Sequence, residues 1–518
     1  MSPRGAFLSG SFILAATLAT APQARAGEIT RDGGVLGCPL SYDLTGNPGI
    51  LYAFAPSFSA GPTPLFIFDP GNPGVLDIGL DLIPLLKVSA FDGFGFSSVD
   101  YGTLPAQASL SGLVMRAQMV EIPFFPNFLG DISPLNAFTL GIAGDTHFTI
   151  GNNVDGLYGH TAETLDDGRV LLIGGYDDDA PGINNFRDTY VMFDNQTETY
   201  SVLLGLMAEP RGAHASVKLE DGRVLSVGGA DPAGTSIMTA EIWDPVTETA
   251  AFVATMNEQR TLPTLTLMND GRVFCSGGVK NWTFTDVIGS LNAATASTEV
   301  YDPVADTWTP GPNLPKGRVG HQASLLGDGT VLITGGLEIT TLFGMSTLTL
   351  TNTCQRYDPV TDTFLPTASF TGQRALHGQV TLNNGNALIA GGFDGNVVTL
   401  MLSGLTSTAV YNFQNNTWTN TASLNSGRGN VQLLNTGDEI VALGGFTSVD
   451  FQTFAGPGST AIDTAPQSIL FWTSQPPMKT GRQLAISNVF GGGKKILTTG
   501  AGFETFGPLD DTGEIFFP

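Results

Sequence analysis

Charged residues are scarce in this sequence, and positively charged residues most of all. Only 13% of the 518 residues are charged, and 22 Lys and Arg stand against 47 Asp and Glu, which gives a net charge of −25. No basic tract occurs anywhere along the chain. Nucleic acids and anionic membrane surfaces attract positive charge, so this balance argues against both as partners.

Cysteine is also rare, with only Cys38, Cys275 and Cys354 present. An odd number leaves at least one thiol unpaired. The repeat pattern described below predicts Cys275 in an inner strand and Cys354 in an outer strand, where a free thiol behaves as a small apolar side chain. The sequence leaves open whether these two cysteines pair.

Long apolar runs are missing beyond the N-terminus. Residues 7–21 are apolar, follow Arg4, and precede Ala24-Arg25-Ala26, which has the form of a signal-peptidase site. The apolar segment is too short to span a bilayer comfortably. We therefore predict a signal peptide over residues 1–26, a secreted protein that is extracellular or periplasmic, and no membrane span after cleavage.

Glycine, in contrast, is abundant, with 66 residues, and six Gly-Gly doublets recur every 49 to 58 residues. A degenerate seventh copy, Gly500-Ala501, ends the series. The doublets are Gly174-Gly175, Gly228-Gly229, Gly277-Gly278, Gly335-Gly336, Gly391-Gly392 and Gly444-Gly445. Such a period is typical of a repeat fold in which each repeat is one supersecondary unit.

Each repeat has the same internal order. An Arg-x-x-His step opens it, complete at Arg211 and His214, at Arg318 and His321, and at Arg374 and His377. A strand, an Asx-Gly turn and an apolar strand that ends at the doublet follow, and Asx-Gly pairs favour type I′ hairpins. After a loop of variable length comes an aromatic residue with Asp-Pro, as in Tyr301-Asp302-Pro303, and a second aromatic residue seven positions after the first.

These motifs resemble the kelch family over about 370 residues, in the form seen in secreted bacterial proteins. The resemblance implies an all-β protein with a seven-bladed propeller at residues 143–518, of the galactose-oxidase type but without its copper site. The last repeat stops after its third strand, so we expect residues 146–150 to supply the missing strand and close the ring. Residues 27–142 carry no repeat and predict a small β-sandwich-like domain.

The repeated histidines and arginines are the first candidates for chemistry. Histidine is a common metal ligand, but equivalent positions on different blades are spread around a ring, so we expect His160, His214, His321 and His377 to be structural. We expect the same of Arg211, Arg260, Arg318, Arg374, Arg428 and Arg482, with guanidinium groups bonded to carbonyls or carboxylates between blades. The sequence indicates no cofactor.

Copper oxidases of the galactose-oxidase type share this propeller. That family needs a Tyr linked to a Cys, a Tyr followed directly by a His, and a His in a domain after the propeller. This chain has no Tyr-His dipeptide, and we expect no domain after the repeats. Kelch-type sugar epimerases and mutarotases place acid and base residues in the central pocket, and no signature of theirs is matched here.

The loops after the doublets supply the remaining candidates. Asp177, Asp178 and Asp179 follow the first doublet and are weak candidates for Ca²⁺ ligands, with a solvated acidic loop as the alternative. The loops of repeats three to six are long and lie on one face, which often marks the binding face. Their aromatic residues can stack on sugars or anchor a peptide, or pack on one another: Trp282, Phe284, Phe343, Phe451 and Phe454.

From the sequence we therefore expect a secreted, monomeric, non-enzymatic binding protein. Its partner is an extracellular glycan or protein, held at the loop face. The alternative is a carbohydrate-active enzyme, epimerase- or mutarotase-like or less readily a copper oxidase, with its site at the central channel. Convergent carboxylates at the channel mouth favour the enzyme, and an aromatic loop face without them favours binding.

Overall fold

The structure is a computed structural model that describes only part of the chain. The described residues are 29–32, 35–36, 39–64, 75–79, 81–105, 107, 110–111, 113–122, 132–140, 146–149, 159–177, 185–283, 286–342, 345–396, 401–450, 457–480, 482, 486–490, 495–499 and 513–518. The predicted signal peptide and Cys38 lie outside them.

The chain divides into two compact units. The first comprises residues 1–30, 42–99 and 117–135, and the second comprises residues 31–41, 100–116 and 136–518. Segments 31–41 and 100–116 thus group with the repeats, while the boundaries predicted from the sequence, 27–142 and 143–518, stay a prediction.

Strands in the first 140 residues form three small sheets. Their strand orders are β1 (Ile29–Asp32), β2 (Pro39–Thr45) and β7 (Phe96–Thr103); β6 (Lys87–Ala90), β3 (Leu51–Ser57), β8 (Val114–Ile122) and β9 (Asn136–Thr139); and β4 (Ala60–Pro64) with β5 (Val75–Ile78). Burial alternates along β2, where Leu40, Tyr42 and Leu44 are buried, as a strand with one apolar face requires. Segment 76–88 holds the end of β5, the 3₁₀ turn η2 (Ile83–Leu85) and the start of β6.

The repeats form four-stranded antiparallel sheets, which we number 1 to 7 along the chain. Sheets 1 to 6 each take their strands from one repeat in chain order, whereas sheet 7 adds an N-terminal strand. The sheets are β11 (Thr161–Thr164), β12 (Val170–Ile173), β15 (Thr189–Asp194), β16 (Thr199–Leu206); β17 (Ala215–Lys218), β18 (Val224–Val227), β19 (Ala240–Asp244), β20 (Thr249–Phe252); β21 (Thr264–Leu267), β22 (Val273–Ser276), β23 (Thr298–Asp302), β24 (Thr307–Pro310); β26 (Gln322–Leu325), β27 (Val331–Thr334), β30 (Cys354–Asp358), β31 (Thr363–Leu365); β32 (Gly378–Thr381), β33 (Ala387–Ala390), β36 (Thr408–Asn412), β37 (Thr417–Asn420); β38 (Gln432–Asn435), β39 (Glu439–Leu443), β41 (Ile462–Pro466), β42 (Thr473–Gln475); and β43 (Ile486–Phe490), β44 (Lys495–Thr499), β45 (Glu514–Phe516), β10 (Thr146–Phe148).

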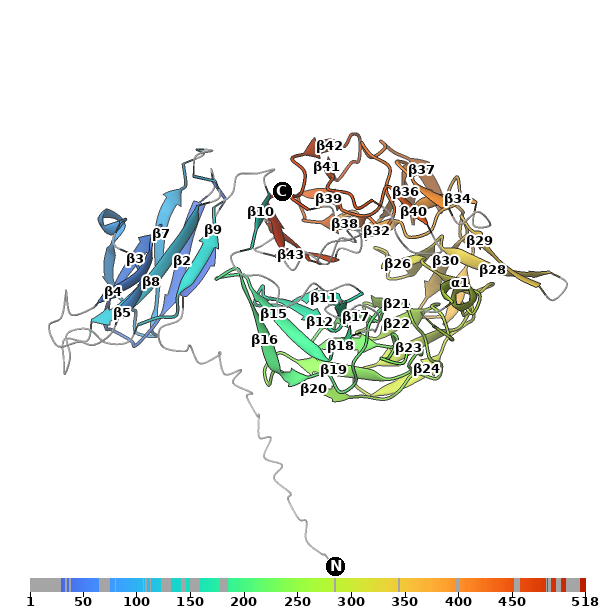
Figure 1. The fold of residues 1–518 in the computed structure, drawn as a ribbon, viewed down its shortest axis with the longest axis horizontal. Helices are drawn as coiled ribbons and strands as arrows, with labels where there is room; N and C mark the ends of the chain where they lie inside the picture. Colours follow the sequence, from blue (N-terminus) through green and yellow to red (C-terminus); the bar gives the residue numbers. More distant parts are fainter. Residues whose placement is uncertain are drawn as a thin grey trace, which may run out of the picture. The chain divides into compact units, whose positions relative to one another are not determined.

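The first strands of the sheets lie innermost around a common centre (Figure 1). Each first strand contacts the first strand of the next sheet, and β43 of sheet 7 contacts β11 of sheet 1. At the other edge of sheet 7, β10 pairs antiparallel with β45, Thr146 opposite Phe516 and Phe148 opposite Glu514.

Local sequence explains the sheets. The Asx-Gly turns join the first and second strands, and Gly168, Gly222, Gly271, Gly329 and Gly385 all have positive φ of 80° to 83°. The second strands of sheets 1 to 5 are wholly buried, so their apolar runs belong to faces covered on both sides. The paired aromatic residues of strands three and four pack against each other within a sheet, with the tilted rings of Tyr301 and Trp308 5.0 Å apart. Cys275 and Cys354 are both buried free thiols.

The long loops fold into a second layer of structure over sheets 3 to 6. They contain the short helix α1 (Val287–Leu291), the hairpin of β28 (Leu337–Leu342) and β29 (Met345–Leu350), and the sheet of β34 (Phe393–Asn396), β35 (Met401–Gly404) and β40 (Ser448–Asp450). Strand β25 (Arg318–Val319), from the step that opens repeat 4, pairs with β28. Strand β40 comes from the loop of sheet 6 and pairs with β35 from the loop of sheet 5. The described part of the loop in sheet 1 forms the two-residue strands β13 (Tyr176–Asp177) and β14 (Asn185–Phe186).

Candidate functional site

The arginine of each Arg-x-x-His step is buried and binds its own sheet. In sheet 3, Arg260 Nη1 donates to the carbonyls of Gly277 and Ser297 at 3.0 and 3.1 Å, and its Nη2 lies 2.6 Å from Glu299 Oε1. Arg211, Arg318 and Arg374 donate to the equivalent carbonyls of their own sheets. The prediction of guanidinium bonds between repeats is therefore wrong, because the doublet within reach belongs to the same repeat.

The link between neighbouring sheets runs instead through the arginine backbone. The second glycine of each doublet donates its N–H to the carbonyl of the next sheet's arginine, as Gly278 does to Arg318 at 3.1 Å. Gly277 and Gly278 have φ of 59° and 94°, and a Cβ on Gly277 would lie 2.6 Å from the Arg318 carbonyl oxygen. Only glycine suits this conformation and this approach, so the doublet fixes how closely two sheets pack. The same bond joins Gly175 to Arg211, Gly229 to Arg260, Gly336 to Arg374, Gly392 to Arg428 and Gly445 to Arg482.

Most of these buried arginines also have a buried carboxylate partner. The partners of Arg211, Arg260, Arg318, Arg428 and Arg482 are Glu241, Glu299, Glu338, Asp463 and Glu514. Arg374 is the exception, since Ala409 of β36 occupies the position held by Glu299 in β23. Burial without a close carboxylate lowers the pKa of Arg374 to about 10, and two carbonyls and Ser407 Oγ satisfy its Nη donors.

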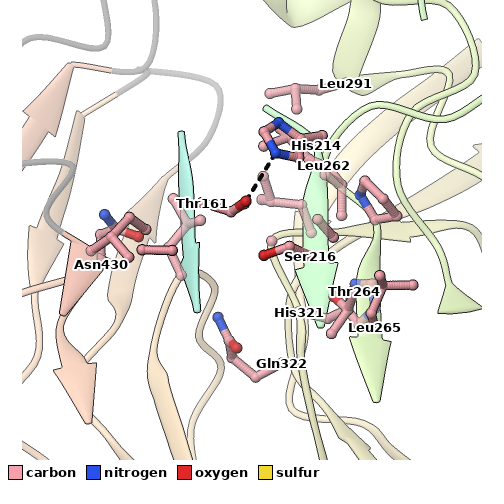
Figure 2. A pocket seen from close by; sticks show the side chains of 18 of the residues that line it. Thr161, His214, Ser216, Leu262, Thr264, Leu265, Leu291, His321, Gln322 and Asn430 are labelled. Atoms are coloured by element: carbon pink, nitrogen blue, oxygen red, sulfur yellow. Dashed lines mark hydrogen bonds between the residues drawn. The ribbon is translucent and has the colours of Figure 1, made fainter. Parts of the chain in front are cut away.

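The repeated histidines bond hydroxyl groups of the preceding sheet. Nε2 of His160, His321 and His377 lies 2.8 to 3.0 Å from the hydroxyls of Thr499, Ser276 and Thr334. Each of these hydroxyls belongs to the residue directly before a doublet position. His214 differs, because the residue before the doublet of the preceding sheet is Ile173, which has no hydroxyl. Its ring bonds the hydroxyl of Thr161 at 2.9 Å instead (Figure 2). Burial lowers the pKa of His160 to about 4 and that of His321 to about 3, so these rings are neutral at pH 7.

The residue before each of these histidines adopts a left-handed backbone conformation. Gly159, Ala213, Leu262, Gly320, Leu376 and Asn430 occupy equivalent positions with φ between 51° and 64°. Their peptides bond from sheet to sheet: Ala213 N–H donates to Gly159, Leu262 to Ala213, and Leu376 to Gly320, each at 2.8 Å. Non-glycine residues are strained in this region. The bonds hold these residues in place around the end of the central channel nearest the loops.

A pocket of about 410 Å³ opens at this end of the channel (Figure 2). Its rim is mostly apolar, formed by Leu262, Leu291, Val319, Leu337 and Leu376, with Asn430 as a polar member. Leu291, Val319 and Leu337 belong to the same buried cluster as Val279, Phe393 and Phe446 of the long loops. The pocket is therefore continuous with the loop layer.

Deeper in the pocket lies one carboxylate, that of Glu163 on β11. Ser216 Oγ on β17 donates to Glu163 Oε1 at 2.8 Å. Among the residues that line the pocket, Glu163 is the only one with a charged side chain, since burial lowers the pKa of both His214 and His321. Burial raises the pKa of Glu163 above its usual range. Neither the repeat pattern nor a motif singles out this residue, although the sequence shows it as the one acidic residue in the seven first strands.

The candidates from the loops are only partly described. Trp282 is half-buried and packs against the loop cluster, and its backbone N–H donates to Ser236 Oγ at 3.1 Å. Phe284, Phe343, Phe451 and Phe454 lie outside the described residues, as do Asp178 and Asp179, and Asp177 is described only through its pairing with Asn185. Across the described ranges, no group of three or more His, Cys, Asp or Glu is placed to hold a metal ion. Likewise, none of the described helices is long and apolar enough to cross a membrane.

Comparisons with known proteins agree with this architecture. A model of the kelch motif matches residues 267–315. Kelch-like protein terF of Aspergillus terreus is 30% identical over 153 residues, which are 27% of this chain and 30% of that protein. Human Kelch-like protein 33 is 28% identical over 143 residues, 27% of this chain and 25% of that protein. This chain thus spans less than a third of the length of these curated relatives.

Among solved structures, a novel fungal alcohol oxidase of the AA5 family in complex with copper is similar in fold. Its TM-score is 0.52 at 14% identity, over 72% of this chain and 76% of that chain. The repeated four-stranded sheets and this likeness define a β-propeller. The motif match and the two relatives support kelch repeats within it.

Proposed function

We propose that this kelch propeller is a binding protein that holds a segment of a protein partner at the loop end of its channel. The observation that carries the proposal is the pocket itself, whose apolar rim is continuous with the loop layer. Apolar pockets with few polar groups are typical of recognition sites. The kelch motif and the kelch-like relatives support an interaction role.

We propose further that the propeller has seven blades, closed by β10. Three observations support this: the first strands contact one another in sequence from β11 to β43 and back, β10 pairs with β45, and an ion pair recurs across the seam. Lys495 of sheet 7 lies 2.9 Å from Glu198 of sheet 1, as Arg169 of sheet 1 lies 3.3 Å from Glu248 of sheet 2. Sheets 7 and 1 thus pack as sheets 1 and 2 do.

The alternative, an enzyme with its site in the channel, has less support. Such an enzyme needs convergent acid and base groups, and Glu163 is the one carboxylate that lines the pocket. The fungal oxidase was solved in complex with copper. In this chain the Nε2 atoms of the channel histidines His214 and His321 already bond Thr161 and Ser276. Export, a monomeric state and a glycan as an alternative ligand stay proposals that rest on the sequence.

Selection of peptides from a random display library against the whole protein tests the proposed function. Leu262 is partly exposed on the rim, and Leu262→Asn keeps the left-handed backbone, since Asn430 occupies the same position in sheet 6. Loss of this apolar contact weakens binding of selected peptides about tenfold or more. The control Val304→Asn changes an equally apolar residue on an exposed turn outside the pocket and leaves binding unchanged. Failure to select any peptide, or equal loss in both variants, contradicts the proposal.

A further inference from the structure

The charge inside the channel is unusually simple. Across the seven first strands, all of them described, Glu163 and Lys218 are the only charged side chains. Lys218 Nζ lies 2.5 Å from Asp166 Oδ1 on the turn after β11, so its charge already has a partner. Glu163 forms no ion pair among the residues that the structure describes, although the charge of Lys218 on the neighbouring strand favours its ionised form.

The surroundings of Glu163 hold it in place without an ion pair, because Lys218 pairs with Asp166. Ser216 Oγ donates to Oε1, and the Lys218 backbone N–H also bonds the carboxylate. Above it, Thr161 shares its hydroxyl with the neutral His214, and the rim beyond is formed by leucine and valine side chains. A carboxylate held by one hydroxyl and one N–H still has acceptor sites for a further donor.

A ligand that matches this pocket has an apolar stem and a cationic head. Lysine and arginine side chains have this form, since their methylene stems pack on apolar surfaces while the charged group finds a polar partner. An acidic group would place a like charge against Glu163, and a purely apolar group would bury the carboxylate without a partner. Both are unfavourable.

We propose that the channel pocket is a specific site for a basic side chain of the partner protein, whose stem passes the leucine rim and whose cation pairs with the Glu163 carboxylate. This inference rests on the proposed function for its partner and adds the chemistry of the contact. The net charge of −25 favours approach of a basic segment.

The test uses n-butylammonium, the lysine side-chain analogue, as a probe that needs no knowledge of the partner. Ligand-observed NMR titrations at constant ionic strength compare it with neutral n-butanol on the whole protein. We expect butylammonium to bind at least tenfold more tightly than butanol, and Glu163→Gln to abolish that difference. Glu220→Gln, the same change on an exposed turn, leaves it intact. Ser216→Ala, which removes the hydroxyl that orients the carboxylate, weakens ammonium binding less than Glu163→Gln does.

The outcomes separate this inference from the proposed function. Equal binding of butylammonium and butanol, or equal binding of butylammonium to wild type and Glu163→Gln, overturns the basic-side-chain site. Selected peptides that bind the wild type, depend on Leu262 and ignore Glu163→Gln overturn this inference while the proposed function stands. If the library gives no peptide but the ammonium titration shows the expected dependence on Glu163, the proposed function fails and the cation site stands.

Discussion

The buried pair of Arg260 and Glu299 provides a sharp test of how the sheets are stabilised. Glu299 is fully buried and accepts from Arg260 Nη2 at 2.6 Å and from the backbone N–H groups of Asn257 and Glu258 at 2.7 and 3.2 Å. Glu299→Val removes the counter-charge and leaves the guanidinium buried. Loss of one partner of a buried pair costs about 3–5 kcal/mol. Arg260 keeps its bonds to Gly277 and Ser297, so we expect about 3 kcal/mol.

Repeat 1 shows how the double variant should behave. At the positions of Arg260 and Glu299 its sequence has Leu157 and Val191, two apolar residues. Replacement of a buried pair by apolar residues of similar volume is often neutral. Arg260→Leu with Glu299→Val leaves the Gly277 carbonyl and the Asn257 N–H without their partners, so we expect a net loss of about 1–2 kcal/mol, less than for Glu299→Val alone.

The assay is equilibrium urea unfolding, with hydrogen exchange of β22 and β23 to assign the transition to sheet 3. Local exchange is needed because a chain of two compact units need not unfold in a single step. Glu220→Val on an exposed turn is the matched control for removal of a carboxylate. A double variant as unstable as the sum of the two single variants would refute the reasoning, since it would mean that the charges are not coupled.

Further predictions concern other parts of the same architecture. We expect Glu163→Gln to raise the stability of the folded protein at pH 7. Because folding raises the pKa of Glu163, the stability that its carboxyl group contributes is present below pH 4.5 and is lost as the pH rises through the folded pKa. Urea unfolding midpoints measured against pH check this. We expect His321→Gln to make stability fall less steeply on acidification. Between pH 6.5 and the folded pKa of about 3, His321 binds a proton in the unfolded chain but not in the folded one, so acid favours unfolding. The same urea series measures this slope. Gly277→Ala brings a Cβ against the Arg318 carbonyl oxygen at 2.6 Å and adds strain at positive φ, so it costs about 2 kcal/mol or more in thermal unfolding, whereas Gly372→Ala meets no atom and costs about 1 kcal/mol from φ alone.

The strand pattern could be predicted from the sequence because its determinants are local. The Asx-Gly turns and the apolar runs before the doublets act over six residues, and β12, β18, β22, β27 and β33 lie where these runs predict them. The doublet itself was visible as a motif, but its cause was not. Its two left-handed glycines are set by the carbonyl of an arginine about forty residues further on, in another sheet.

The direction of the arginine side chains is a case where the sequence pattern misled. A repeated Arg next to a repeated doublet predicts a contact but does not say which repeat's doublet is reached. The acidic residues held a signal. At one equivalent position of the third strand, Glu241, Glu299 and Glu514 occur in repeats that open with an Arg, whereas Val191 occurs in repeat 1, which has Leu157 in place of the Arg. That correspondence within repeats indicates a contact within one sheet.

A second correspondence, between neighbouring repeats, identifies the histidine partners. Thr499, Ser276 and Thr334 stand directly before a doublet position, and the next sheet around the ring has His160, His321 and His377 respectively. Where the residue before the doublet is Val227, Ala390 or Leu443, the histidine position of the next sheet holds Pro263, Val431 or Ala485. Ile173 before His214 breaks the rule, and there Thr161 supplies the hydroxyl. Buried polar groups need partners, so the two residue types are retained or lost together.

Against this background Glu163 stands apart. The carboxylates of Glu241, Glu299, Glu338, Asp463 and Glu514 each pair with a buried arginine of the propeller. Glu163 sits where the other first strands carry valine, threonine, serine, leucine or asparagine, and its burial opposes ionisation. Sequences depart from locally favourable choices mainly at functional sites. A cation from outside the chain would complete the same pairing that the arginines provide elsewhere, which is why stability gained and ammonium binding lost in Glu163→Gln must appear together.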